Sequence, residues 1–557
     1  MTGTERRGPR ANIKTTTDMT RQASETRPHA ARPACARRVG QLGVLGLAVA
    51  MVSMFVGVGR SGAAIAPGLG YDPLNDMGSL SAITRMVGAQ NLWAAGYTGT
   101  GVGVALIDTG VTRVPGLNTP GQVIDGPDLS FDSQYPTLAH MDAFGHGTHM
   151  ASIIAGHDPI TPTTTNSKCA TCLNKSPYSD TTKFEGVAPN ATLISIKVGA
   201  SDGANDVTQI AAGIDWAVTH RKDPGLNIRV INLSYGTNST QRYQTDPIAF
   251  AAENAWRHGI VVVAAAGNDG DTTTVGMADP AYDPAILAVG ADDPNGTLNT
   301  SDDTIPSWAD HGTPARPVDL VAPAVHVLGL RVPGSQVDAA NPTAVVGTRF
   351  IRGSGTSQAA AVVTGAAALL VQKYPTATPD QIKAMLRLST SKFGSSTDGK
   401  ANYRGMGFVN GTFASLSLSS EAAQAVALAN PALGTGTLDA ARGGIYVSDN
   451  GVDLAGERDI FANAWNPLTY VPASTTVTAW NLGLWRNARW AADTWATSTA
   501  WGTTIWTATD WAGQPWTNAT TTNPTWDGSR WKGSAWSGSR WKGSRWSGSR
   551  WSGSRWG

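Results

Sequence analysis

Short, unbroken apolar runs alternate with amphipathic stretches through the middle of the chain. The apolar runs have the length of strands and lie at 102–110, 191–198, 229–233, 260–266, 285–290 and 318–325. Helical patterns lie at 82–95, 150–155, 207–219, 247–258, 359–371, 379–388 and 420–428. Apolar runs without polar alternation indicate strands that are buried on both faces. The sequence therefore predicts an α/β fold, a mostly parallel central sheet with helices on both faces.

The N-terminal segment has the pattern of an export signal. Residues 1–38 are polar and basic, the run 39–59 carries no charge, and Ala64-Ile65-Ala66 has small residues on both sides of a variable one. We interpret 1–66 as a secretory signal peptide with a long basic lead. Because the uncharged run is nearly long enough to cross a bilayer, an uncleaved N-terminal anchor is the alternative. In either case we expect a secreted or envelope-associated protein.

Composition narrows the classes of partner. Charged residues make up 15% of the chain and the net charge is +1, so we expect no general attraction to nucleic acid. Cys35 lies in the export segment, while Cys169 and Cys172 form a C-x-x-C in a polar stretch, 157–185, that we expect to be a loop insertion. Without a second pair, a zinc ribbon is not expected, and a small loop disulfide is the preferred interpretation.

Three residues stand where chemistry is expected. Ser357 opens an apolar helix, where free backbone N–H groups favour negative charge, although a simple N-cap is the alternative. Asp108 ends an apolar strand, the position at which open α/β sheets bind ligands, although turn aspartates are common. His146 and His149 have the spacing of metal ligands on a helix, but no Glu follows His146. A general base is therefore the better interpretation for His146.

These stretches resemble a subtilisin-like serine protease, a subtilase, over roughly residues 80–430. Five motifs carry the resemblance, in the family's order: Ile107-Asp108-Thr109-Gly110, Gly145-His146-Gly147-Thr148-His149, Asn232-Leu233-Ser234-Tyr235-Gly236, Ala264-Ala265-Ala266-Gly267-Asn268 and Gly355-Thr356-Ser357. Each motif alone is modest. All five in the subtilisin order Asp, His, Ser, with strand–helix alternation between them, form a specific signal.

The resemblance implies an exported serine endopeptidase with a catalytic triad of Asp108, His146 and Ser357, and with Asn268 in the oxyanion hole. It implies substrate binding at Ser234, Tyr235, Gly236, Ala265 and Gly267, with Tyr235 at the rim of the primary pocket. We expect protein or peptide substrates, a monomer and no required cofactor; a structural calcium ion is left open. The alternative is a catalytically latent subtilase-fold protein that serves as an envelope-binding or structural protein.

The sequence departs from the family pattern at two places. Gln358, Ala359, Ala360 and Ala361 follow the serine in place of Met, Ala, Thr and Pro, and we expect Gln358 to face the buried side of the helix. Only about 35 residues separate Ala66 from the first core strand, so we expect no propeptide of the family type.

The composition changes beyond residue 430. We expect a linker at 431–475 and a Trp-rich pentad repeat region at 476–557, because Trp recurs mostly every five residues there and the last repeats approach Trp-Ser/Lys-Gly-Ser-Arg. A period of five fits neither a strand face nor a helix face. A solenoid, a loosely ordered binding segment and a disordered tail remain open. For an exported chain, interleaved Trp and Arg favour a cell-envelope glycan or an anionic polymer as partner over nucleic acid.

Overall fold

The computed structural model describes residues 71–487 except 135–137, 160–181, 271–275, 300–301, 393–403, 406–429, 445, 450–451, 462 and 482. All described residues belong to one compact unit. The predicted export segment, the cysteine pair, the helix expected at 420–428 and the repeats beyond 487 lie outside them. No helix in the described part of the chain combines the length and the apolar character that a membrane span needs.

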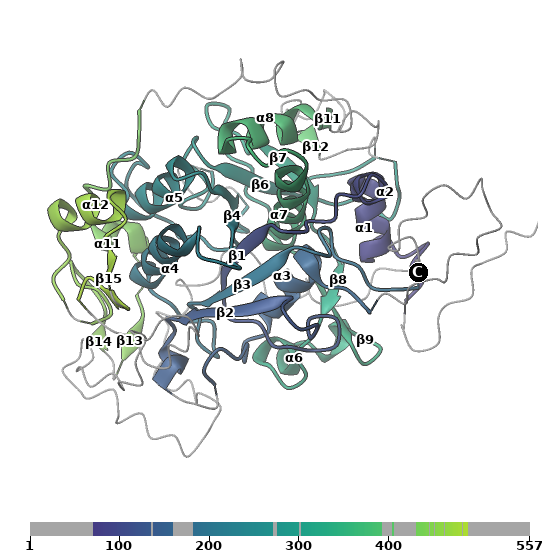
Figure 1. The fold of residues 1–557 in the computed structure, drawn as a ribbon, viewed down its shortest axis with the longest axis horizontal. Helices are drawn as coiled ribbons and strands as arrows, with labels where there is room; N and C mark the ends of the chain where they lie inside the picture. The colour runs from purple at the N-terminus through teal and green to yellow at the C-terminus, as the bar shows by residue number, and fades with distance from the viewer. Residues whose placement is uncertain are drawn as a thin grey trace, which may run out of the picture. The chain divides into compact units, whose positions relative to one another are not determined.

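A nine-stranded sheet forms the centre of the unit, in the order β11-β12-β7-β6-β5-β4-β1-β3-β2 (Figure 1). The strands are β1 (Gly103–Asp108), β2 (Val123–Asp128), β3 (Thr192–Lys197), β4 (Ile228–Leu233), β5 (Val261–Ala265), β6 (Leu287–Asp292), β7 (Leu320–Pro323), β11 (Ser391–Lys392) and β12 (Arg404–Gly405). Every pair is parallel except β11 with β12. β1, β5 and β6 are buried along their whole length. The prediction of a mostly parallel α/β sheet is confirmed.

Helices cover both faces of this sheet. α3 (His146–Ala155) and α7 (Thr356–Lys373) pack together, while α4 (Val207–His220) and α5 (Pro247–Arg257) pack together on the other face; α8 (Pro379–Leu388) contacts α7 (Figure 1). The starts of the helices follow from local sequence. Asp206 caps α4 in a capping box with Gln209, Asp246 caps α5, and Thr378 caps α8.

The structure differs from the predicted elements near the N-terminus of the unit and before α7. The single helix expected at 82–95 is two helices, α1 (Leu80–Met86) and α2 (Ala89–Ala94), because Gly88 between them has φ +72° and interrupts the helix. A second, antiparallel sheet, β8-β10-β9, was not predicted. It consists of β8 (Val327–Leu330), β9 (Val345–Val346) and β10 (Phe350–Gly353), with α6 (Gln336–Ala340) between β8 and β9. These elements are too short for a clear period.

The described residues of 430–487, where we expected a linker at 431–475 and the start of the repeat region at 476, form helices and strands that pack against the helices of the central unit. This region, here called the C-terminal segment, contains α11 (Leu438–Arg442), α12 (Pro467–Thr475), β13 (Ser448–Asp449), β14 (Val452–Asp453), β15 (Trp480–Asn481) and β16 (Leu484–Trp485). α11 and α12 contact α4 and α5.

The first two tryptophans of the repeat are part of this packing. Trp480 Nε1 donates to Ala212 O at 2.9 Å, and Trp485 Nε1 donates to Asp215 Oδ2 at 2.9 Å; both rings are buried. A Gly- and Asp-rich composition suggested a connector. The apolar residues of the C-terminal segment are nevertheless buried at irregular spacing, which no periodicity reveals.

Candidate active site

The sheet topology brings candidate residues together at the carboxyl-terminal ends of the central strands. β1 lies between β3 and β4, so the chain continues from β1 toward one side of the sheet and later returns to the other side. Ligands of open α/β sheets bind at such a reversal, outside the carboxyl ends of the strands. Asp108 is the last residue of β1, and Ser234 follows the last residue of β4.

Asp108 and His146 form a buried pair. His146 is the first residue of α3, and its Nδ1 lies 2.7 Å from Asp108 Oδ1, with both side chains completely buried. The same carboxylate oxygen accepts a hydrogen bond from Thr109 N at 2.7 Å. Because an ionised carboxylate only accepts, the Nδ1 atom carries the proton and Nε2 is the nitrogen that can accept one. The pair is the one that a general base and its orienting carboxylate need.

Asp142 holds the start of α3 in place, a role that the sequence interpretation missed. Its Oδ1 accepts from Gly145 N at 2.6 Å and from Thr109 Oγ1 at 2.8 Å, and its Oδ2 accepts from Thr148 N at 2.7 Å. Burial raises the pKa of Asp142, although these hydrogen bonds act against that rise. The signal was a carboxylate just before a helix start, where free N–H groups need acceptors.

His149 belongs to the core. Burial, together with electrostatic repulsion from the neighbouring His146 site, lowers the pKa of His149 to about 3, so the His149 ring is neutral near neutral pH. The ring lies against β8, where a Cβ on Gly329 would come within 2.8 Å of it. Within the described ranges, no group of three or more His, Cys, Asp or Glu side chains is arranged to hold a metal ion.

Ser357 is the second residue of α7 and lies beside the predicted substrate-binding residues. Its Oγ donates to Ser234 O at 3.4 Å, and Ser234 Oγ donates to Ser357 O at 3.3 Å. Ser357 and Ser234 are both completely buried in this conformation. Gln358 is also completely buried, as its position on the helix predicted.

Asn268 is oriented by the residue before Ser357. Its Oδ1 accepts from Thr356 N at 3.0 Å and from Thr356 Oγ1 at 3.1 Å, which leaves the amide Nδ2 as its donor group. The preceding Gly267 has φ +117°, and a Cβ there would lie 2.2 Å from Asp310 Oδ2. The turn that presents Asn268 thus requires glycine at this position.

The predicted walls of the primary pocket are close to these groups, with one difference. Ala265 is completely buried in β5, which pairs with β4. Tyr235, between Ser234 and Gly236, is 1% exposed, so its ring is part of the core and the prediction of a rim position is wrong. Burial, reinforced by the carboxylates of Asp206 and Asp279, raises the pKa of Tyr235 well above its usual value.

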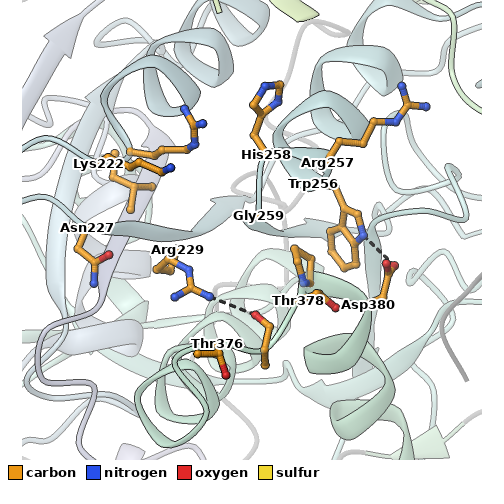
Figure 2. A pocket seen from close by; sticks show the side chains of 14 residues that line it. Lys222, Asn227, Arg229, Trp256, Arg257, His258, Gly259, Thr376, Thr378 and Asp380 are labelled. Atoms are coloured by element: carbon orange, nitrogen blue, oxygen red, sulfur yellow. Dashed lines mark hydrogen bonds between the residues drawn. The ribbon is translucent and has the colours of Figure 1, made fainter. Parts of the chain in front are cut away.

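A cavity of about 570 Å³ lies away from this site. It opens where β4 begins, beside Lys222 and Arg229 on one side and His258 and Asp380 on the other (Figure 2). Arg229 donates to Pro375 O and Ala377 O, and Trp256 Nε1 donates to Asp380 Oδ1. Since Asp108 and Ser234 stand at the opposite ends of the parallel strands, this cavity is not part of the candidate active site.

Comparisons with known proteins identify the family of this chain. A profile of the subtilase family, peptidase S8, matches residues 99–411. The chain is 34% identical over 321 residues to serine protease AprX of Bacillus subtilis (strain 168), covering 56% of this chain and 66% of AprX. It is 32% identical over 330 residues to subtilisin DY of Bacillus licheniformis, covering 58% of this chain and 94% of that protein. A solved cold-adapted subtilisin-like serine proteinase is 25% identical with a TM-score of 0.40, covering 56% of this chain and 89% of that structure.

Proposed function

Because the chain belongs to the subtilase family of serine endopeptidases, we propose that it hydrolyses peptide bonds through Asp108, His146 and Ser357. The observation that supports the proposal is the buried pair of Asp108 and His146 at the carboxyl end of β1. Its Nδ1 and Oδ1 atoms lie 2.7 Å apart. A serine hydroxyl is a weak nucleophile unless a neighbouring base takes its proton. The oriented imidazole supplies that base.

In the proposed reaction, Ser357 Oγ attacks the carbonyl carbon while His146 Nε2 accepts the hydroxyl proton. The imidazolium is stabilised by Asp108, which keeps the proton on Nδ1. The tetrahedral intermediate collapses to an acyl-enzyme, and His146 transfers its proton to the leaving amine. Water then attacks the ester with His146 again as base, releasing the acid and restoring the serine hydroxyl.

Asn268 and the start of α7 stabilise the charge that develops on the carbonyl oxygen. The Asn268 amide, held by Thr356, and the Ser357 N–H at a helix N-terminus are two donors of the kind that bind an oxyanion. Ser234 and Gly236 supply main-chain groups beside the nucleophile. An extended substrate that pairs with such a segment gains affinity independently of its side chains, which favours broad specificity.

The test is labelling of the exported, full-length protein with a fluorophosphonate, which transfers its phosphonyl group to an activated serine oxygen and releases fluoride. We expect the wild type to be labelled and Ser357→Ala to be folded but unlabelled. His146→Ala and Asp108→Asn should be nearly as inactive on a peptide amide. A Ser357→Ala protein that cleaves the amide at the wild-type rate would exclude the assignment. A folded, unlabelled wild type would favour the latent, envelope-binding alternative.

We further propose that the chain is exported and that residues beyond 487 bind envelope polymers. The basic lead, the uncharged run at 39–59 and the small residues at 64–66 support export. Seven basic residues against one acidic residue in 526–557, interleaved with Trp, support binding to an anionic polymer. The test is co-sedimentation of the full-length protein, and of a chain ending at residue 487, with purified envelope material. Equal sedimentation of the two at low salt would count against the tail.

A further inference from the structure

The C-terminal segment holds the residues that directly follow the predicted substrate-binding segment 234–236. Thr237 Oγ1 donates to Ala441 O at 2.5 Å, and Thr240 N donates to Ala440 O at 3.1 Å. On its other edge, Thr237 exchanges backbone hydrogen bonds with Asp279, at 3.1 and 2.9 Å. The segment is therefore held between the protease core and α11.

Arg442, the last residue of α11, is a buried cation with a complete set of partners. It is 2% exposed, and its Nε donates to Asp206 Oδ1 at 2.7 Å. The terminal guanidinium nitrogens donate to Gly456 O at 2.7 Å and to Arg458 O at 2.6 Å. Because the guanidinium is planar and donates to acceptors in three directions, it fixes the positions of these acceptors relative to one another. The ammonium group of a lysine, on its flexible side chain, fixes them less well.

The partner of Arg442 belongs to an element beside the predicted site. Asp206 caps α4, and its Oδ2 accepts from Thr208 N at 3.0 Å. The ion pair therefore joins α11 to the start of α4.

The chain leaves α11 in backbone contact with the same region. Gly443 has φ +69°, and a Cβ at this position would lie 2.4 Å from Asn238 O. Only a residue without a side chain allows this approach. The hydrogen bonds at 237 and 240 and this contact at 238 act on one short stretch of the fold, while the ion pair holds the end of the same helix, α11, to α4.

We propose that Arg442 is a positioning residue for substrate binding: through Asp206 and α11 it fixes the wall formed by residues 234–236 for an extended peptide. The inference rests on the proposed function. Main-chain pairing needs several donors and acceptors in register, so a small displacement of the wall weakens binding of a long peptide. The attack by Ser357 on a small substrate does not need that wall.

Two sets of substitutions separate positioning from general stability. Arg442→Lys keeps the charge but loses the planar array of donors. Arg442→Gln combined with Asp206→Asn removes both charges, so no unpaired charge is buried, and asparagine remains a good helix cap. The matched control is Lys383→Arg, because Lys383 is also a buried cation, 3.0 Å from Asp319, on α8 where it donates to Pro284 O and Ile286 O.

The experiment measures fluorophosphonate labelling rates, and kcat and KM for a single-residue ester and for a peptide with several residues before the scissile bond. For both Arg442 variants we expect KM for the peptide to rise about 10- to 100-fold, with kcat, ester hydrolysis and labelling within about twofold of the wild type. Lys383→Arg should leave all of these values unchanged.

Three results would overturn the inference. Folded Arg442 variants with the wild-type KM for the peptide would show that the ion pair does not position the wall. Equal losses on ester, peptide and labelling would show a structural role alone. A wild type that neither labels nor cleaves would instead overturn the proposed function and, with it, this role for Arg442. The wild-type control identifies this third case, and the comparison of peptide, ester and labelling separates the other two.

Discussion

We predict that ionisation of Asp215 on α4 makes the stability of the folded protein depend on pH. Its carboxylate is 3% exposed, accepts from Ser474 Oγ at 2.6 Å and from Trp485 Nε1 at 2.9 Å, and so joins the protease fold to the start of the Trp repeat. Burial raises the pKa of Asp215 from 3.8 to about 6, although the hydrogen bonds from Ser474 and Trp485 act against that rise. Asp215→Asn keeps the shape of the side chain and removes its ionisation.

The sign and size of the effect follow from linkage. At pH values above its folded-state pKa, ionised Asp215 destabilises the folded state. The rise in its pKa from 3.8 to about 6 corresponds to a loss of about 3 kcal/mol in the free energy of unfolding. This cost declines as the pH falls below 6 and is about 0.5 kcal/mol at pH 4, where Asp215 is protonated in the folded state but still partly ionised in the unfolded state. The free energy of unfolding of Asp215→Asn, relative to that of its parent, should therefore be about 2.5 kcal/mol higher at pH 8 than at pH 4.

The assay is denaturant unfolding followed by circular dichroism at pH 4, 6 and 8, with Ser357→Ala as the common background to prevent self-digestion. Comparing each variant with its parent at all three pH values cancels any constant packing change caused by the amide. Asp319→Asn is the control of opposite sign: burial acts against ionisation of Asp319, but the charges of Arg316 and Lys383 outweigh it and hold its pKa below the usual value. A difference between Asp215→Asn and its parent that does not change with pH would refute the reasoning.

Two further predictions concern the catalytic edge. Asn268→Ala should lower kcat for a peptide by about 10²- to 10³-fold, the size known for such a donor in a subtilisin, while unfolding stays close to wild type; steady-state kinetics would contradict this if kcat were unchanged. Gly147→Ala should reduce both stability and the labelling rate, although alanine normally favours helices, because its Cβ would lie 2.1 Å from Gly110 O and 3.1 Å from Asp108 Oδ1. A thermal unfolding midpoint and a labelling rate equal to those of the wild type would exclude the clash.

Much of the candidate site could be predicted because its signals are local. Asp108 ends an apolar strand, His146 begins a helix after a glycine, and Ser357 stands at the second position of the longest apolar helix. Parallel strands place their carboxyl ends at one edge, so strand–helix alternation already implies that such residues converge. The pair of Asp108 and His146 follows from this rule.

Other features of the site were missed or misplaced because they depend on packing. Asp142 looks like any polar residue before a helix until its two oxygens are seen to hold Gly145, Thr148 and Thr109. Tyr235 was expected at the rim of the pocket because the family resemblance implied it. Its ring is instead surrounded by core residues, which the sequence of one strand does not specify.

The sequence by itself determined the parallel core of the sheet, the order of the motifs and the candidate residues of the site, because burial of a strand on both faces and the start of a helix leave marks within a few neighbouring positions. Only the tertiary structure decided that the C-terminal segment belongs to the protease fold. Arg442 meets Asp206 across 236 positions of sequence, and Trp485 meets Asp215 across 270. Contacts at such separations arise from how whole elements pack, and they leave no period or spacing along the chain.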